Sequence, residues 1–247
     1  AGGKIIALPS ADGKVALDDL ETYLSGWLSE HVVTPRVLSL TQVTDNGYVY
    51  SCEELAALTR LAHEHGLYVH VDGARIANAV AASGRDLSEM VAETGIDVLS
   101  FGGTKNAFMF GEAIVCLNRE LAPYFKHTRK SCGQLPSKMR YIAAQFHEAL
   151  RDGLWLETAR HANAMARYLY QKMDASLAFS APIIPEANQL FAFVDPSISQ
   201  ALKEDYSYND FGPLPGISRF VTSWDTEEGE IDAFIERAEY LLENLNK

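Results

Sequence analysis

Three charged residues of this 247-residue chain have types and positions that suit a reaction centre. Asp72 and Arg75 follow the apolar run 67–71, and Lys105 follows the apolar run 98–101 in a glycine-containing loop. A lysine amine can form a Schiff base with an aldehyde cofactor. A carboxylate can keep the ring nitrogen of pyridoxal phosphate protonated, so that the ring remains an electron sink. Because a buried aspartate or lysine charge is costly without a partner, the other reading that stays open is a structural ion pair.

Each residue also has an ordinary structural alternative. Asp72 could cap the N-terminus of the helix that the next residues predict, since Asp is a preferred capping residue. Lys105 could be an exposed lysine in an ordinary loop. The residue types and spacing alone leave these alternatives open.

The elements that must position these residues alternate between strand and helix from residue 36 to 117. This alternation predicts βαβ units and a mainly parallel sheet, whose last strand can return as a hairpin. Ser51 and Glu54 form a capping-box pattern at the start of the first helix, and Gly66 ends it. We predict strands over 36–40, 67–71, 98–101 and 113–117, and helices over 51–65, 75–83 and 87–94. Chemistry in such sheets collects beyond the carboxyl ends of the strands, where Asp72 and Lys105 stand.

The pattern changes after residue 137, where long helical periodicities replace the alternation. We predict helices over 137–150, 154–173, 197–203 and 226–246, and strands over 189–194 and 217–223. The sequence therefore predicts two domains, a larger one over 1–153 and a smaller α+β domain over 154–247.

Composition excludes several classes of protein. Lys and Arg number 21 against 33 Asp and Glu, a net charge of −12, which disfavours binding to nucleic acids and to anionic membranes. No apolar run is long enough to span a membrane. The three cysteines form no CxxC pattern, so we expect no structural metal or disulfide framework and predict reduced thiols in the cytoplasm. Five histidines fall on helical stretches and are expected on solvated faces: His63, His65, His127, His147 and His161.

Two segments carry a resemblance to a known family. VHVDGARIANAV (69–80) and LSFGGTKNAF (99–108) resemble signature segments of the L-threonine aldolase family. Further similar segments span 39–55, 133–146, 152–166 and 217–224, and two of them point to the bacterial low-specificity, phenylserine-type branch. The resemblance implies the α/β fold of type I, aspartate-aminotransferase-like pyridoxal phosphate enzymes, with a mainly parallel sheet and a smaller α+β domain.

The resemblance also implies roles for individual residues. Lys105 would bind the cofactor aldehyde, Asp72 would pair with the pyridine nitrogen, and Arg75 would lie near the cofactor 3-hydroxyl and orient substrate. Arg219 would hold the substrate carboxylate, as a bidentate arginine clamp can.

Four further residues have weaker assignments. His70 shares a strand face with Asp72 and is either a partner that tunes this carboxylate or a core histidine. The Thr104 hydroxyl either reaches the cofactor phosphate or holds a turn. Lys138 and Arg140 resemble positions that lend positive charge to the phosphate, and a solvated helix face is their structural alternative. The loop 41–50 lacks a histidine that some family members carry.

The implied reaction is retro-aldol cleavage of L-threonine or a related β-hydroxy-α-amino acid to glycine and an aldehyde, in a homodimer or homotetramer and without a metal. The alternatives are a β-eliminating lyase of the same fold and a non-catalytic scaffold. The family's phosphate loop and ring-stacking histidine are not found, and segment 1–24 resembles the part that follows them. We therefore expect the sheet to be incomplete at its N-terminus and the chain alone to be weakly active or inactive.

Overall fold

The computed structural model describes residues 3–10, 13–26, 31, 33–123, 125–211 and 216–245. The chain divides into two compact units, Ala1–Trp155 and Leu156–Lys247.

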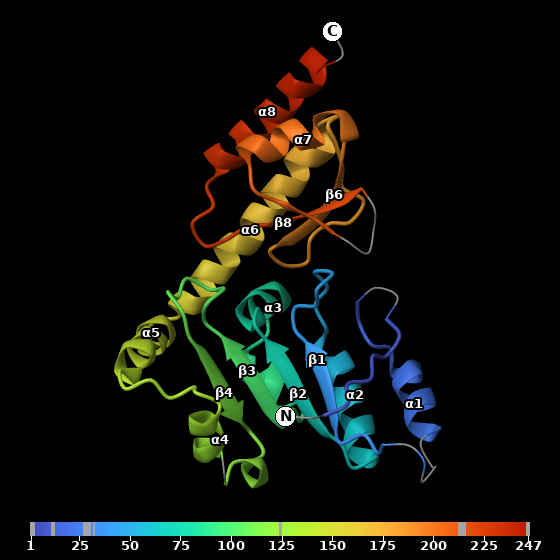
Figure 1. Cartoon of the computed structure of the whole chain (residues 1–247), viewed down its shortest axis with the longest axis vertical. Coiled ribbons are helices and arrows are strands. Elements are labelled where there is room, and N and C mark those ends of the chain that lie inside the picture. Colours follow the sequence, from blue (N-terminus) through green and yellow to red (C-terminus); the bar gives the residue numbers. More distant parts are fainter. Residues whose placement is uncertain are drawn as a thin grey trace. The chain divides into compact units, whose positions relative to one another are not determined.

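The first unit contains a four-stranded sheet in the order β1-β2-β3-β4 (Figure 1). Its strands are β1 (Val37–Thr41), β2 (Tyr68–Gly73), β3 (Val98–Gly102) and β4 (Glu112–Cys116). The first three strands are parallel, and β4 returns antiparallel to β3. The predictions of a mainly parallel sheet and of a returning last strand are confirmed.

The helices of this unit are α1 (Leu17–Ser25), α2 (Cys52–Glu64), α3 (Ile76–Ser83), α4 (Phe125–Ser131) and α5 (Met139–Arg151). The capping box of α2 is present as predicted, because the Ser51 hydroxyl accepts from the Glu54 amide and the Glu54 carboxylate accepts from the Ser51 amide. A 3₁₀ turn, η2, spans Arg119–Leu121.

The predicted helix 87–94 is wrong in type, because Ser88–Ala92 forms a π-helical turn, η1. The Glu93 amide donates to the Ser88 carbonyl at 3.0 Å, which is the i→i+5 bond of a π-helix. The Thr94 hydroxyl lies 3.0 Å from each of the carbonyls of Met90 and Val91 and donates to them, so a side chain meets carbonyls that an α-helical ladder would use.

The two faces of this sheet differ in chemistry. One face is buried and apolar, and α2 and α3, which contact β2, carry buried apolar residues of their own. The apolar face of the sheet comprises Leu38, Leu40, Val69, Val71, Leu99 and Phe101. The other face carries exposed or half-buried polar side chains, namely Ser39, Thr41, His70, Asp72 and Ser100. Burial of the apolar face, at about 1.5–3 kcal/mol per large side chain, fixes the strand register and with it the polar face.

The second unit packs helices against an antiparallel sheet in the order β5-β6-β8-β7 (Figure 1). Its strands are β5 (Phe179–Ser180), β6 (Gln189–Val194), β7 (Asn209–Asp210) and β8 (Ile217–Val221). Its helices are α7 (Pro196–Asp205), α8 (Glu228–Leu245) and the larger part of α6, which spans Leu154–Ala175. Met173, Leu190 and Phe234 belong to one apolar core that these elements share.

Candidate active site

Asp72 lies within β2, one residue before its end, and not beyond the strand as the sequence predicted. Its Oδ1 accepts from the amide of Ala74 at 3.0 Å, which closes a tight turn after the strand. The N-cap of α3 is Arg75, with no side-chain cap bond. The alternative of Asp72 as a helix cap is therefore wrong, and its carboxylate stands half-buried at the carboxyl end of the strand.

Lys105 lies exposed in the loop that joins β3 to β4. The hydroxyl of Thr104 accepts from the Gly111 amide at 3.0 Å, so Thr104 holds the turn, and an accepting hydroxyl can still donate to a phosphate. On the other side, the buried Asn106 amide donates to the Trp155 carbonyl at 2.8 Å. Both neighbours of Lys105 are thus fixed, while the lysine side chain itself extends outward.

The loop of Lys105 and the turn of Asp72 meet at Gly102. A Cβ atom at Gly102 would lie 2.6 Å from both the Cα and the carbonyl oxygen of Ala74. Such a distance excludes every side chain, so only glycine allows the end of β3 to approach the end of β2 this closely. Among the described residues no ion pair joins Asp72 to Lys105, which removes the structural ion pair as an explanation of the two charges.

The donor set at these strand ends fits pyridoxal phosphate. A half-buried carboxylate with one oxygen held by the backbone suits a protonated ring nitrogen, and an exposed amine on a neighbouring loop suits an aldehyde carbon. Arg75 stands at the start of α3, three residues after Asp72. The three candidate residues of the first unit, Asp72, Arg75 and Lys105, therefore lie at one edge of the sheet.

His70 lies on the same strand face as Asp72, two residues earlier. Its Nδ1 is 2.9 Å from the Ser39 hydroxyl, and its Nε2 is 2.9 Å from the Ser100 hydroxyl. Burial lowers the pKa of His70 below its ordinary value, and the charge of Asp72 opposes this shift. His70 is thus hydrogen-bonded across three strands and coupled electrostatically to Asp72.

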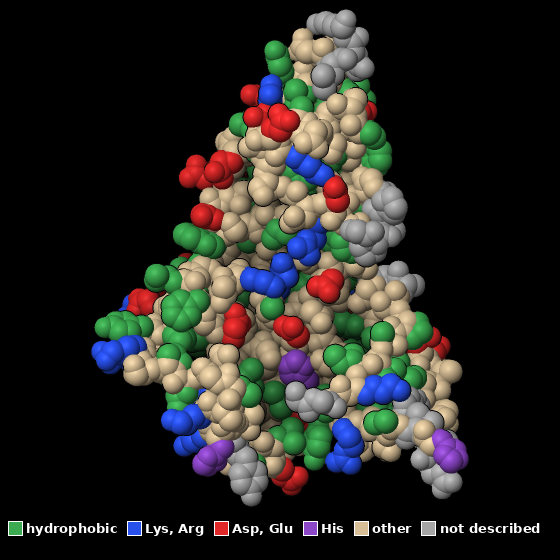
Figure 2. Space-filling view, viewed as in Figure 1, with side chains coloured by type: hydrophobic (Ala, Val, Ile, Leu, Met, Phe, Trp, Pro, Cys, Tyr) green, Lys and Arg blue, Asp and Glu red, His purple; other side chains and the backbone are tan. Residues whose placement is uncertain are grey.

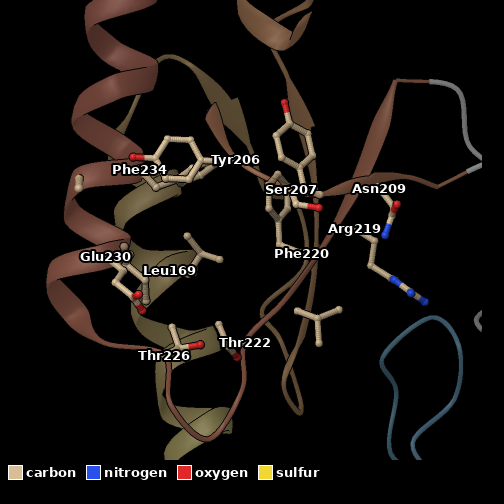
Figure 3. Close-up of a pocket in the computed structure, with 14 residues that line it drawn as sticks. Leu169, Tyr206, Ser207, Asn209, Arg219, Phe220, Thr222, Thr226, Glu230 and Phe234 are labelled. Atoms are coloured by element: carbon tan, nitrogen blue, oxygen red, sulfur yellow. The ribbon is translucent and has the colours of Figure 1, made fainter. Parts of the chain in front are cut away.

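Arg219 lies on β8 in the second unit, paired in register with Phe191 and Asn209. Its guanidinium points away from α8, on the opposite side of the strand from the neighbouring Phe220 ring (Figure 3). Arg219 also lines a cavity of about 570 Å³, whose wall includes the aromatic rings of Tyr206 and Phe234. The alternation of the strand therefore places the arginine off the apolar core, where its charge is available to a ligand.

Lys138 and Arg140 begin α5. Lys138 is its N-cap residue without a side-chain cap bond, and the Arg140 guanidinium lies 4.9 Å from the centre of the Tyr141 ring. They belong to a basic stretch, 121–147, that contains five Lys and Arg residues and no Asp or Glu. Blue side chains over α4 and α5 mark this stretch in Figure 2.

The five histidines predicted on solvated faces are all exposed, namely His63, His65, His127, His147 and His161. His63 also has a buried partner, because its Nε2 lies 2.9 Å from the Oδ2 of Asp97. Asp97 directly precedes β3, at the sheet edge opposite Asp72. Burial opposes ionisation of Asp97, but hydrogen bonds from His63, the Val69 amide and the Asn118 side chain hold its pKa below the ordinary value. Here the histidine joins α2 to the sheet. His161 likewise has a partner, the Thr226 carbonyl at 2.8 Å.

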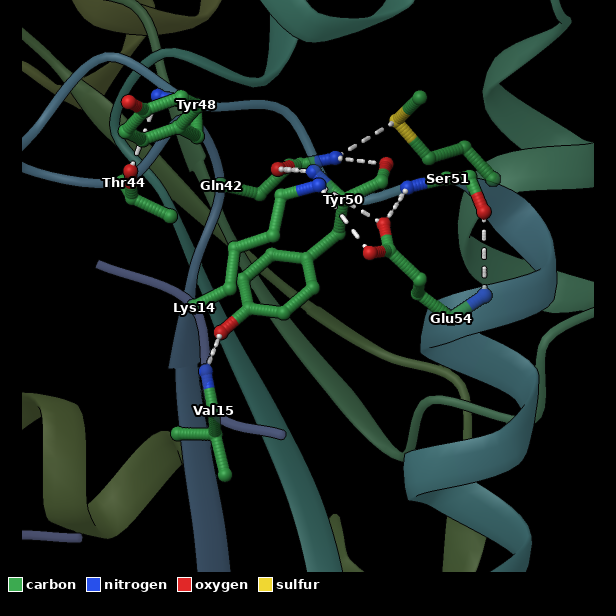
Figure 4. Close-up of polar contacts among 9 residues, drawn as sticks. Lys14, Val15, Gln42, Thr44, Tyr48, Tyr50, Ser51 and Glu54 are labelled. Carbon is green, nitrogen blue, oxygen red and sulfur yellow. Dashed lines mark hydrogen bonds and ion pairs between the residues drawn. The ribbon is translucent and has the colours of Figure 1, made fainter. Parts of the chain in front are cut away.

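The side chain of Gln42 shapes the loop after β1, and no sequence pattern indicated this role. Gln42 is fully buried, and its side-chain amide bonds both the carbonyl and the amide of Tyr50, at 2.9 and 3.0 Å (Figure 4). Its backbone amide donates to the Asp72 carbonyl at 2.8 Å. In the sequence, Gln42 is only a polar residue that follows a strand. Neither its burial nor its hydrogen-bond partners could therefore be predicted.

No group of three or more His, Cys, Asp or Glu side chains in the described part of the chain is arranged to hold a metal ion. Of the helices in that part, none combines the length and hydrophobicity needed to cross a membrane.

Comparison with known proteins identifies the family. The family model of the beta-eliminating lyases matches residues 1–196. Low specificity L-threonine aldolases from Pseudomonas sp. and Pseudomonas aeruginosa are each 38% identical, over 93% and 92% of this chain. The chain spans 66% and 65% of the length of these curated relatives.

Solved structures agree with the sequence comparison. A threonine aldolase of Leishmania major superposes with a TM-score of 0.89 at 34% identity, over 98% of this chain and 71% of the other. A putative L-allo-threonine aldolase of Listeria monocytogenes, with a TM-score of 0.69 at 18% identity over 95% and 67% of the two chains, shows the fold alone. The predicted resemblance and fold class are confirmed. The chain belongs to the beta-eliminating lyase family, has the fold of type I pyridoxal-phosphate-dependent enzymes, and is similar to threonine aldolases along almost its whole length.

Proposed function

We propose that this protein is a pyridoxal-phosphate-dependent aldehyde-lyase. It would cleave L-threonine or a related β-hydroxy-α-amino acid to glycine and an aldehyde. The observation that carries this proposal is the contact of the Asp72 turn with the Lys105 loop through Gly102, in a chain 38% identical to relatives named low specificity L-threonine aldolase.

Residues of the first unit would hold the cofactor. Lys105 would bind its aldehyde carbon through the side-chain nitrogen, Asp72 would keep a proton on its ring nitrogen, and Arg75 would contact its 3-hydroxyl. Bound pyridoxal phosphate supplies an electron sink for the bond that breaks at the substrate α-carbon. Asp72 contributes by keeping its negative charge next to the ring nitrogen, which favours the protonated ring.

The second unit would contribute the substrate clamp. Arg219 would bind the α-carboxylate with two parallel N–H donors, which fixes the orientation of the substrate as well as its position. We accordingly propose a cofactor domain over 1–153 and a small domain over 154–247. Thr104 and the basic residues Lys138 and Arg140 are candidates for contacts to the cofactor phosphate.

The second candidate is β-elimination, which the description of the matched family favours. The two reactions need the same cofactor and differ in the bond that breaks. Aldol cleavage of a β-hydroxy-α-amino acid releases glycine and an aldehyde. β-Elimination instead expels the β-hydroxyl group as water, and hydrolysis of the product releases ammonia and a keto acid, which is pyruvate when the substrate is serine. Product analysis with phenylserine and with serine therefore separates them.

The cofactor assignment is tested by incubating the purified chain with pyridoxal phosphate, recording the visible spectrum and reducing with borohydride. Peptide mapping should place the reduced label on Lys105. Lys105→Ala should lose band and label, and Lys126→Ala, which removes an exposed lysine of α4, should keep both. A label that survives Lys105→Ala, or no label on the unaltered chain, would contradict the proposal and favour a scaffold.

We further propose a homodimer or homotetramer and a cytoplasmic location. Exposed apolar side chains such as Phe110, Ile114 and Tyr141 support association between chains. The three cysteines are free thiols, as expected in a reducing compartment. Light scattering coupled to size-exclusion chromatography measures the mass directly.

A further inference from the structure

Ser39, His70 and Ser100 form a hydrogen-bonded chain that crosses three neighbouring strands. Ser39 is the register partner of His70 on β1, and Ser100 is the register partner of Asp72 on β3. Both imidazole nitrogens lie 2.9 Å from a hydroxyl oxygen. The ring is therefore held on both sides, on the strand face that also carries Asp72.

A neutral imidazole matches these partners. It donates from one nitrogen and accepts at the other, and a serine hydroxyl can take either part. The ring thus satisfies both nitrogens without gaining a proton. Its partial burial acts in the same direction, because burial disfavours the charged form.

Neutrality at residue 70 matters because of Asp72. Two residues of strand place the side chains about 7 Å apart on one face. Among the described residues, Asp72 is the charged group that acts electrostatically on His70, so a positive ring would in turn act on Asp72. A cation at residue 70 would compete for the negative charge of Asp72 with any positive group that Asp72 binds.

We propose that His70, clamped between Ser39 and Ser100, is a positioning residue that stays uncharged and so leaves the full negative charge of Asp72 to the protonated ring nitrogen of the cofactor. This inference rests on the proposed function and assigns the two serines a part in it. It treats His70 as acting through Asp72, without touching cofactor or substrate.

The test compares two substitutions that differ in charge. His70→Gln keeps one donor and one acceptor and stays neutral, whereas His70→Lys adds a positive charge. We expect His70→Lys to bind pyridoxal phosphate about tenfold more weakly than His70→Gln, as for two charges about 7 Å apart at a partly screened site. The matched control is Val37→Lys, which adds the same charge to the same sheet face at a side chain that is 54% exposed.

A second measurement does not depend on a lysine fitting at residue 70. The NMR titration of the unaltered chain should show His70 protonating below the ordinary value of 6.5. The cofactor affinity should fall in the same pH range, and His70→Gln should lack that step, because Asp72 is the charged partner and Ser39 and Ser100 do not titrate.

The outcomes separate this inference from the proposed function. Two results would overturn the inference alone, provided that borohydride still labels Lys105. One is an equal affinity of His70→Lys and His70→Gln for pyridoxal phosphate, and the other is an unchanged pH profile in His70→Gln. A failure of the unaltered chain to bind the cofactor would overturn both. A selective loss in His70→Lys, with Val37→Lys near the unaltered chain, supports the inference.

Discussion

Replacing Gly102 by alanine should separate the two strand ends that form the candidate site. The added methyl would lie 2.6 Å from the Cα and from the carbonyl oxygen of Ala74. These are backbone atoms of the turn that Asp72 closes, so no flexible side chain can move aside. The strain must be relieved by moving the end of β3, and with it the Lys105 loop, away from the end of β2.

The size of the effect follows from the contact distance. Carbon atoms pack at about 3.5–4.0 Å, so relief requires a displacement of about 1 Å. Overpacking of this kind costs about 1–3 kcal/mol of stability. A 1 Å misplacement of reacting groups can lower a rate by about 100-fold. We therefore expect Gly102→Ala to lower the rates of cofactor capture and turnover far more than its loss of stability alone would lower them.

The assay combines two readouts. Hydrogen exchange followed by mass spectrometry should show peptides of β2 and β3 exchanging about 30-fold faster, equivalent to about 2 kcal/mol. The rate of borohydride-trapped labelling of Lys105 measures the site. The control is Gly229→Ala in α8, where an added methyl meets no atom within 4 Å and helix propensity favours alanine by about 1 kcal/mol.

Two results would refute this reasoning. If Gly102→Ala labels at the rate of the unaltered chain, the close approach of the strand ends does not position the site. If Gly229→Ala loses as much activity as Gly102→Ala, the effect belongs to the substitution and not to the contact with Ala74.

Three further predictions concern other parts of the chain. Asp97→Asn should lower the free energy of unfolding by about 1–3 kcal/mol at neutral pH, measured by urea unfolding. Because the folded pKa of Asp97 is lowered, the stability that Asp97 contributes is present above its unfolded pKa and is lost as the pH falls through its folded pKa. The same difference between variant and unaltered chain at acid pH would contradict this prediction. Arg219→Lys keeps the charge but loses the bidentate geometry, so KM for phenylserine should rise about tenfold with a smaller change in kcat, and an unchanged KM would exclude the carboxylate role. Ser51→Ala should destabilise α2 by about 1 kcal/mol and Ser51→Gly by only a few tenths, and equal urea midpoints for the two variants would contradict the capping role.

The elements that the sequence predicted best carry their signals locally. The capping box of Ser51 and Glu54 lies within four residues, and Gly66 and Gly84 end their helices with positive φ angles of 73° and 66°. The six strands that the sequence predicted lie within about two residues of those observed, because their apolar runs are bounded by turn residues. The two-residue strands β5 and β7 and the helix α4 were not predicted. α1 was missed, since its N-cap, Ala16, makes no side-chain cap bond and so gives no start signal.

The contacts that the sequence could not predict join residues far apart along the chain. His63 and Asp97 are 34 residues apart, and Ser39 and His70 are 31 apart. Helical periodicity correctly places His63 on a solvated face, but its bond to Asp97 depends on the packing of α2 against the sheet. The residue types of the candidate site were readable, but the clamp on His70 required the strand register.

The antiparallel return of β4 makes the Lys105 loop a local hairpin, closed within ten residues of chain. Pairing β2 with β3 instead requires a crossover through α3 and η1, and the longer loop carries the larger closure entropy. Local contacts form faster than distant ones, so the lysine loop can be shaped before it meets the Asp72 turn. We therefore expect the docking of Gly102 against Ala74 to follow formation of this hairpin, and a cofactor that requires both sides of the candidate site would bind only molecules in which both have formed.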